Sequence, residues 1–440
     1  MNRSRLFGVL CALLFALRCD VAEWPRAAHA AETIPIGVSG PFTGANSPIG
    51  ISMREGIRIA AARINADGGL LGRPIALVER DDQSRNEVGA RVAEQLIERH
   101  RVVAAVGTVD TGVALASHRH YQLARIPVIT AVATGTLITQ QFRAPEFADN
   151  FVFRVAASDR VQAAKIVEEA VVNRGLRRVA IFHDATNYGQ RGRADLEQAL
   201  ARHAISPLLV ERVQPDQNDL GGRLGRARAA GAEVVLAYGI GPELGQLAHA
   251  MAAIGWEVPL IGSWTLGMSG FIDGAGRHAE GARMPQTFIA DAAVPRRKAF
   301  LEAWQAATGT TRIPVPPAAA QGYDSLMLLA AAIRQARSVE GDPIREALEN
   351  LQTPVEGAIM TYIRPFSRDN HEAIAEPRQV QLGEIRGGTV VFAYDSERGL
   401  GARLERRAAH ERVAAGLRGA PRRGHAGGRA AVHGHGRGQP

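Results

Sequence analysis

Cysteine and lysine are the rarest chemically reactive residues in this chain of 440 residues. Both cysteines, Cys11 and Cys19, lie near the N-terminus, so the chain from Ala31 onward has none. This excludes disulfide bonds, zinc–thiolate sites and cysteine nucleophiles from that part of the protein. Lys165 and Lys298 lie in helix-like surroundings, which makes Schiff-base catalysis an unlikely activity.

The motifs of several enzyme classes are also missing. The sequence contains no GxxxxGK[ST] phosphate loop and no GxGxxG after a strand-like segment, so nucleotide chemistry has no support. His183 and Asp184 resemble half of a catalytic triad, but no GxSxG elbow accompanies them, and such a pair more often ends a strand. We therefore expect no enzyme activity, no cofactor and no metal site.

The N-terminus has the features of an export signal. Asn2 to Arg5 form a short basic region, Leu6 to Leu17 are mainly apolar, and Ala28-His29-Ala30 offers a cleavage site. A run of this length is too short to span a bilayer. We predict a signal peptide over residues 1–30, cleaved near Ala30, and a periplasmic location. A lipoprotein anchor at Cys19 is the less favoured alternative, because Arg18 fits that motif poorly.

The formal net charge of +8 comes from the two ends of the chain. From Gly401 to Pro440 nine arginines face two glutamates, and the first thirty residues carry a further excess of two positive charges. The body between them is therefore close to neutral, with a net charge of −1, and we expect no nucleic-acid partner.

Residues 397–440 are rich in arginine, glycine and histidine and have few large apolar side chains. Such a segment cannot bury enough surface to fold alone, so we predict a disordered tail. The alternative is a polyanion-binding or metal-binding arm with His433 and His435 as ligands. We favour the first interpretation because no larger set of metal ligands accompanies these histidines.

Strand-like and helix-like segments alternate through the body of the chain. The strand-like segments are residues 34–38, 75–78, 102–106, 127–130, 151–154, 179–182, 207–210, 234–237 and 258–261. This alternation, without hairpin signals, is typical of an α/β fold with doubly wound parallel sheets. The segments form two sets of similar size, which predicts two lobes joined by a hinge of several connections.

We place the lobe boundaries from this pattern. Lobe 1 is predicted to hold residues 31–153 and 284–374, and lobe 2 residues 154–283 and 375–396. Helix-like segments near 296–307, 320–337 and 343–350 return to lobe 1, and two strand-like segments, RQVQLGEI and GTVVFAY, finish the fold. A cleft between two such lobes is a usual place for a ligand.

Seven segments, in order and in register, resemble one family. They are IGVSGPFTGANSPIG, INADGGLLGRPIALVERDD, VVAAVGTVDTGVALA, IPVITAVATGTLI, RVAIFHDATNYGQ, VVLAYGIGPELGQLAHAM and AAAQGYDSLMLLAAAI. Together they resemble the periplasmic leucine/isoleucine/valine-type solute-binding proteins that deliver ligands to ABC importers. The resemblance runs from about Ile34 to Tyr394. It implies a type I periplasmic-binding (Venus-flytrap) fold in which a small ligand closes the two lobes.

The resemblance also implies a set of ligand contacts. Thr111 and Thr134 match positions whose hydroxyls hold the ligand carboxylate, and Val132 and Ala133 would supply backbone groups beside Thr134. Each threonine lies where a helix is expected to begin, and helix N-termini favour anions. The matched contacts also include Tyr188, an aromatic lid; Tyr323, at the hinge side; and Ile49, where some members have an aromatic wall.

Two positions depart from the family. Amino-acid binders of the family hold the ligand ammonium with an acid after the strand near 258–261, and Trp264 stands there instead. Ile240 stands where a tyrosine often occurs. A buried ammonium without a partner costs several kcal/mol. Either Asp184 or another acid replaces the missing one, or the ligand is a carboxylate that has no amine, for example an aromatic one.

The expected partners are a small ligand, namely an amino acid or related carboxylate, and the membrane subunits of an ABC permease. We expect the protein to be a monomer. The alternative is a sensor of the same fold, which would report its ligand to a signalling protein instead of a permease.

Overall fold

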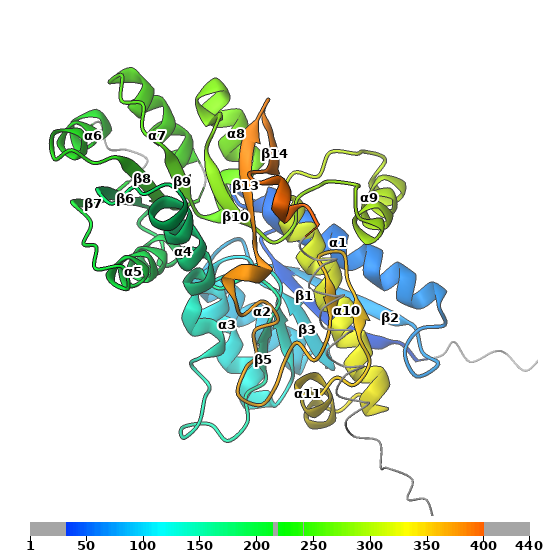
Figure 1. Ribbon diagram of the computed structural model, residues 1–440. Helices are drawn as coiled ribbons and strands as arrows, with labels where there is room; N and C mark the ends of the chain where they lie inside the picture. The colour runs from blue at the N-terminus through cyan, green and yellow to red at the C-terminus, as the bar shows by residue number, and fades with distance from the viewer. Residues whose placement is uncertain (1–31, 214–218, 241, 400–440) are drawn as a thin grey trace, which may run out of the picture.

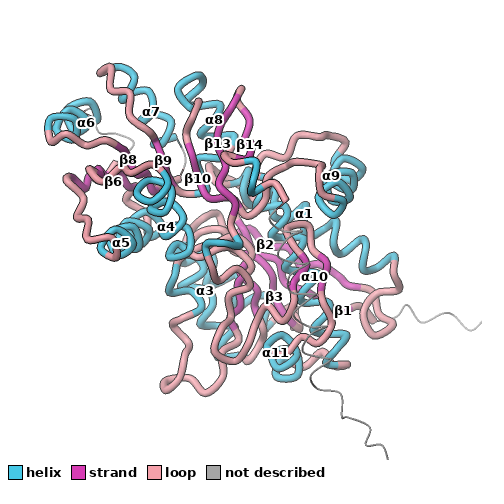
Figure 2. Tube along the Cα trace, in the orientation of Figure 1, coloured by secondary structure: helices cyan, strands magenta, loops and turns pink. Residues whose placement is uncertain are grey.

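The computed structural model describes residues 32–213, 219–240 and 242–399. The predicted signal peptide, nearly all of the predicted tail, and His433 and His435 lie outside the described residues. Within the described residues, two large sheets stand in separate lobes, with strands inside and helices outside, as Figure 2 shows. This confirms the predicted class of fold, two α/β lobes with doubly wound sheets.

The sheet of lobe 1 has five parallel strands in the order β2-β1-β3-β4-β5. They are β1 (Ile34–Gly40), β2 (Ile75–Asp81), β3 (Ala104–Gly107), β4 (Val128–Thr130) and β5 (Val152–Arg154). Helices α1 (Ser47–Ala66), α2 (Asn86–Glu98) and α3 (Thr111–Ala124) connect the first four strands. The strand order reverses between β1 and β3, and ligands of such sheets bind beyond the carboxyl ends of the strands at this point.

The sheet of lobe 2 has seven strands in the order β14-β13-β10-β9-β8-β6-β7. Its strands are β6 (Val179–His183), β7 (Leu209–Arg212), β8 (Val234–Tyr238), β9 (Leu260–Gly262), β10 (Arg283–Gln286), β13 (Gln381–Arg386) and β14 (Thr389–Phe392). Its helices are α4 (Asp159–Val167), with a π-helical continuation over Glu168–Asn173, α5 (Asn187–Ala201), α6 (Leu220–Ala229), α7 (Pro242–Ala253) and α8 (Ser269–Ala275).

Two features of lobe 2 differ from the sequence analysis. Strand β10 pairs with β9 and β13, so residues 284–286, which we had assigned to lobe 1, belong to the sheet of lobe 2. A four-residue strand that contains Pro285 gives little strand signal. The last two strands form an antiparallel hairpin, which we had not expected. Its turn contains Gly387 and Gly388, whose φ angles of 57° and 70° suit the tight turns of hairpins.

The chain then completes lobe 1 with helices that follow lobe 2 in sequence. They are α9 (Pro295–Thr308), α10 (Pro316–Ala336) and α11 (Gly341–Glu349), followed by the short strands β11 (Val355–Glu356) and β12 (Thr361–Tyr362). Figure 1 shows α10 beside α1, although more than two hundred residues separate them in sequence. A Cβ on Gly56 would lie 1.9 Å from the Ala319 carbonyl oxygen, so this close helix packing requires glycine.

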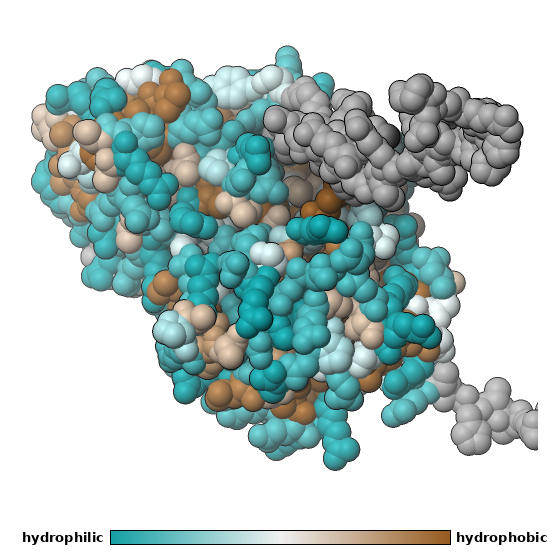
Figure 3. Space-filling view, turned by 60° about the horizontal axis from the view of Figure 1, so that its bottom comes forward, coloured by the Kyte–Doolittle hydropathy of each residue, from teal (hydrophilic) through white to brown (hydrophobic). Residues whose placement is uncertain are grey.

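The lobes are connected three times: after β5, after β10 and before β13. They also touch across the cleft, where the Thr136 hydroxyl of lobe 1 donates to Asp195 Oδ2 on α5 at 2.8 Å. On the face shown in Figure 3, hydrophilic side chains dominate and apolar ones form scattered patches. In the described part of the chain, no helix combines the length and hydrophobicity that a membrane crossing requires.

Candidate ligand-binding site

Two cavities lie where the lobes meet. The outer cavity, of about 540 Å³, is lined by Ala45, Asn46, Ser84, Asn86, Asp110, Thr111, Gly112, Asp184, Ala185, Thr186, Asn187, Tyr188, Gln190, Ile240 and Glu243. The inner cavity, of about 10 Å³, is lined by Thr134, Ala157, Gln162, Trp264, Pro285, Thr287, Pro317, Gln321 and Val380. Both are lined by residues of both lobes, as a ligand that closes the lobes requires.

Thr111 is the first residue of α3, and Asp110 is the N-cap before it. The Thr111 side chain is 2% exposed, and its Oγ1 atom has no hydrogen-bond partner. The first N–H groups of a helix also lack partners within the helix. Thr111 therefore lines the outer cavity and has a buried hydroxyl that no described residue bonds, although it is not the cap itself; its role as a ligand contact stays a prediction.

The loop after β4 places Thr134 at the inner cavity. Only a four-residue 3₁₀ helix, η1 (Thr136–Thr139), follows it, so the expected helix N-terminus does not lie there. The N–H groups of Val132 and Ala133 both donate to the Thr108 carbonyl oxygen, at 3.3 and 3.1 Å. These two residues therefore offer no free N–H donor to a ligand.

A buried ion pair holds this loop in place. Arg154 Nη1 donates to the carbonyl oxygens of Gly135 at 2.6 Å and Thr134 at 3.2 Å, and Nη2 donates to Glu372 Oε1 at 2.7 Å. Arg154 and Glu372 are 0% and 1% exposed. Burial alone raises the pKa of Glu372, but Arg154, Arg160 and hydroxyl donors outweigh it, so the pKa lies below its ordinary value. The pair joins the Thr134 loop to the hinge.

Tyr188 lies in the first turn of α5 and lines the outer cavity. Its ring packs against that of Tyr238, with centroids 4.9 Å apart, and its buried hydroxyl has side-chain hydrogen bonds with Ser263 and Thr265. The Tyr238 hydroxyl donates to Asp159 Oδ1 at 2.7 Å. Burial raises the pKa of Asp159 to about 7. The sequence analysis missed Asp159, which lies at the start of α4, because nothing in its own segment marks it.

Trp264 and Ile240 occupy the positions where the sequence departs from the family. Trp264 is half-buried at the inner cavity, and its backbone N–H donates to Gln162 Oε1 at 3.2 Å. Ile240 lines the outer cavity, and its N–H donates to Asp184 Oδ2 at 2.8 Å. Both side chains pack against the cores of both lobes.

Asp184 is the acid that we considered as a replacement for the missing one. Its Oδ1 accepts from the N–H and the hydroxyl of Thr186, at 2.8 and 2.5 Å, and its Oδ2 accepts from Ile240. These bonds occupy both oxygens of Asp184. The His183 ring contacts the Asp184 backbone carbonyl, at 2.7 Å, and not the carboxylate, so the pair has no triad geometry.

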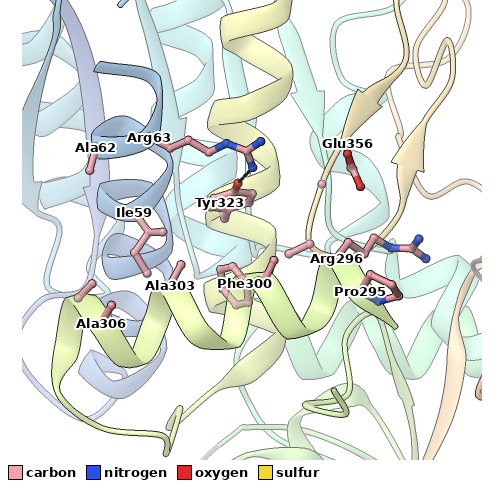
Figure 4. A pocket seen from close by; sticks show the side chains of 14 residues that line it. Ile59, Ala62, Arg63, Pro295, Arg296, Phe300, Ala303, Ala306, Tyr323 and Glu356 are labelled. Carbon is pink, nitrogen blue, oxygen red and sulfur yellow. Dashed lines mark hydrogen bonds between the residues drawn. The ribbon is translucent and has the colours of Figure 1, made fainter. Parts of the chain in front are cut away.

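Two predicted contacts lie away from both cavities. Ile49 is 1% exposed in the core of lobe 1. Tyr323 lies in a groove of about 740 Å³ between α1, α9 and α10, where its hydroxyl accepts from Arg63 Nη1 at 2.6 Å, as Figure 4 shows. The structure therefore brings Thr111, Tyr188 and Ile240 together, and separately Thr134 and Trp264. In the described ranges, no group of three His, Cys, Asp or Glu residues could hold a metal ion.

The comparisons with known proteins define the class. A family model described as periplasmic binding protein matches residues 33–389, and the chain belongs to this family. The fold is that of type I periplasmic binding proteins: one such protein from Bordetella pertussis has a TM-score of 0.72 at 23% identity, with 82% of this chain and 99% of that chain covered.

The individual relatives include a protein of the leucine/isoleucine/valine type that the sequence resembles, and others with different printed ligands. A leucine-, isoleucine-, valine-, threonine- and alanine-binding protein from Pseudomonas aeruginosa is 26% identical over 80% of this chain and 89% of its own length. An amino acid binding protein from the same organism is 32% identical over 51% of this chain, but the match spans only 58% of that protein. A solute-binding protein from R. palustris in complex with benzoate has a TM-score of 0.69 at 21% identity, with 82% of this chain and 96% of that chain covered.

Proposed function

We propose that this protein is the extracytoplasmic binding component of an ABC importer and binds an amino acid or related small carboxylate between its lobes. It binds its ligand without chemical conversion. The relatives support this proposal, since their names include amino-acid binding, and one structural neighbour holds benzoate. The family's periplasmic setting agrees with the signal peptide predicted over residues 1–30.

One observation carries the proposal. Thr111 of lobe 1 and Tyr188 of lobe 2 both line the outer cavity, and Thr111 Oγ1 is a buried atom without a hydrogen-bond partner among the described residues. A buried polar group without a partner costs about 1–3 kcal/mol. A ligand that bonds to the Thr111 hydroxyl and also packs against lobe 2 would have both sets of contacts only when the lobes are closed, and this difference favours the closed state.

The test is binding of a panel of compounds to the purified full chain, measured by thermal shift and calorimetry. The panel holds aliphatic and aromatic amino acids, aromatic carboxylates and short dicarboxylates. A ligand at a hundred times its dissociation constant should add about 2.7 kcal/mol of stability. A folded protein that responds to none of these compounds would contradict the proposal.

The importer role needs a separate test. Ligand uptake by cells that contain a candidate permease should depend on this protein and should be lost when the predicted signal segment, residues 1–30, is removed. Binding without any contribution to uptake would favour the sensor alternative.

A further inference from the structure

One side chain of lobe 1 contacts two helices of lobe 2. The Thr136 hydroxyl donates to Asp195 Oδ2 on α5 at 2.8 Å and accepts from the backbone N–H of Arg160 on α4 at 3.0 Å. Thr136 is the first residue of η1, the short 3₁₀ helix that follows β4. Figure 1 shows α5 of lobe 2 close to α3 of lobe 1, and the two helices are in contact. A single hydroxyl therefore links the lobes through two hydrogen bonds.

The N-terminus of α4 in lobe 2 also depends on lobe 1. Among the described residues, its N-cap, Ser158, makes no side-chain hydrogen bond that caps the helix. Instead, the Asp159 N–H donates to the Thr134 carbonyl oxygen at 2.8 Å, and the Arg160 N–H donates to the Thr136 hydroxyl. The first N–H groups of a helix have no partner within the helix, so acceptors from outside stabilise it. Lobe 1 thus caps a helix of lobe 2.

The Thr136–Asp195 contact is separate from the cavities, because neither residue is among the described residues that line them. Both side chains are partly buried, so water replaces their hydrogen bond only in part. Burial raises the pKa of Asp195, and the Thr136 hydrogen bond and the charge of Arg160 act in the opposite direction. Loss of this bond would leave a partly desolvated carboxylate with one donor fewer, which is unfavourable.

An exposed ion pair also connects the lobes. Arg312 Nη2, in the loop before α10, donates to Asp273 Oδ2 of α8 at 2.9 Å, and the two side chains are 66% and 65% exposed. Such exposed pairs contribute little, because water and salt screen their charges. We therefore expect the partly buried Thr136–Asp195 bond to hold the lobes together more strongly than this pair.

We propose that Thr136 and Asp195 form a latch, a hydrogen bond that stabilises the closed arrangement of the lobes and slows ligand release without touching the ligand. Thr136 is then a positioning residue, because its hydroxyl acts on the cavities through the distance between the lobes. The effect on ligand release rests on the proposed function, whereas the effect on closure does not. The apparent affinity of a ligand for the closed form falls when the closed fraction of the protein falls.

Trp264 can report lobe closure. Its side chain is half-buried and packs against the cores of both lobes, so opening of the lobes should expose it to water. Trp256 and Trp304 are 7% and 3% exposed, and each packs in the core of one lobe. Trp24 lies outside the described residues, in the predicted signal peptide. A change of tryptophan fluorescence on opening should therefore come from Trp264, and Trp264→Phe should remove it.

The first experiment measures tryptophan emission and acrylamide quenching of the purified full chain. Thr136→Val and Asp195→Ala each remove one side of the latch. Both variants should shift the emission to longer wavelength and raise the quenching constant, because a larger fraction of the molecules is open. Thermal unfolding shows whether each variant is folded, and Asp195→Ala keeps the test valid if Thr136→Val does not fold.

Two control variants remove similar groups that make contacts within one lobe. Thr389→Val removes a hydroxyl that donates to the Arg386 carbonyl oxygen in the hairpin of β13 and β14. Glu197→Gln removes a charge that pairs with Arg193 inside α5, the helix that carries Asp195. Both controls should leave the emission and the quenching constant unchanged.

The second experiment measures ligand exchange by stopped-flow fluorescence, with leucine and benzoate as probes. Release from Thr136→Val should be about ten-fold faster, the effect of one hydrogen bond to a charged group, while the association rate stays nearly unchanged. A double variant, Thr136→Val with Asp195→Ala, should release the probe no faster than the faster single variant, because both side chains act through one contact. Arg312→Met should change release by less than about two-fold.

The outcomes separate the latch from the proposed function. If neither latch variant shifts the emission or speeds release, or if Arg312→Met has effects as large as those of Thr136→Val, the inference is overturned even when a probe binds. If neither the probes nor the wider panel bind the folded protein, the proposed function fails, and the emission of the latch variants alone decides the inference.

Discussion

Two carboxylates in this protein have opposite surroundings. Glu372 at the hinge faces Arg154 at 2.7 Å and accepts hydrogen bonds from Thr139 and Ser158. Asp110 at the outer cavity is partly buried, accepts from Asn46 Nδ2 at 2.9 Å and has a side-chain hydrogen bond with Ser84. Their pKa values move in opposite directions, down for Glu372 and up for Asp110. Glu372 has the cationic partner Arg154, whereas the hydrogen-bond donors of Asp110 are the neutral side chains of Asn46 and Ser84.

The largest effect is expected from breaking the hinge pair. Arg154→Met would leave buried Glu372 with only the half-exposed Arg160, 3.6 Å away, as a counter-charge, and would free the carbonyls of Thr134 and Gly135. Unfolding in urea should show a loss of about 3–5 kcal/mol. The double variant Arg154→Met with Glu372→Met should recover part of this loss. If the double variant is less stable than Arg154→Met alone, the Glu372 side chain stabilises the fold through contacts other than its ion pair with Arg154.

The next effect is a pH dependence of the free energy of unfolding, and the buried carboxyl of Asp82 tests it. Asp82 is 0% exposed, and burial raises its pKa to about 7 from an ordinary value of 3.8. Between these values the unfolded chain has lost the proton that the folded protein keeps, so Asp82 makes stability fall as pH rises, by up to about 1.4 kcal/mol per pH unit. Asp82→Asn should remove this contribution, as measured by urea unfolding from pH 4 to 7.

Glu372 gives the opposite slope. Because its pKa is lowered in the folded protein, its contribution to stability is present above the ordinary pKa of about 4.5 and is lost as pH falls below it. The variant Glu372→Gln should therefore differ from the wild type less at low pH than at neutral pH. An unchanged difference across this range would contradict the contrast between paired and unpaired carboxyls.

Thr111 should affect binding but not stability. Thr111→Val keeps the shape and removes a hydroxyl that has no partner in the protein, so the free energy of unfolding should stay within about 0.5 kcal/mol. Ligand affinity should fall about ten-fold or more if the hydroxyl bonds to a charged ligand group. A clear loss of stability would show that the hydroxyl already serves the fold.

The smallest effect tests how closely the lobes approach. A Cβ on Gly112 would lie 2.5 Å from Asn86 Oδ1 and 2.9 Å from Asn187 Nδ2, on the opposite lobe. Gly112→Ala should hold the lobes slightly apart and weaken binding several-fold, measured by calorimetry. Gly225→Ala, in α6 where a Cβ would meet nothing, is the matched control and should stabilise the protein by about 0.5–1 kcal/mol.

The sequence predicted the elements better than their contacts. Local patterns placed β6 and β8 within one residue of their observed ends, because buried parallel strands are short apolar runs. The Arg154–Glu372 pair joins residues 218 positions apart, and no local pattern marks such a pair. The position of Trp264 after a strand of lobe 2 followed from the family resemblance. The half-buried Trp264 side chain contacts the cores of both lobes, and these contacts depend on how the lobes meet, which no local pattern shows.

The candidate site was predictable only in part. Thr111, Tyr188 and Ile240 came from matched positions, and the structure places them around one cavity. Asp110 and Asp159 were missed because an acid next to a helix start is usually a solvent-exposed cap. Their hydrogen bonds with Tyr238 and Asn46, which come from distant segments, are properties of the folded chain.

The hairpin of β13 and β14 has a consequence for how the molecule is made. Strand β13 covers the edge of β10, so the last strands of the described chain complete a sheet whose other strands were synthesised much earlier. A chain that stops before Gln381 would leave that edge open to pairing with other molecules. If the chain is exported as proposed, lobe 2 can complete its sheet only after these last strands have crossed the membrane, and premature termination should yield aggregates rather than a shortened binding protein.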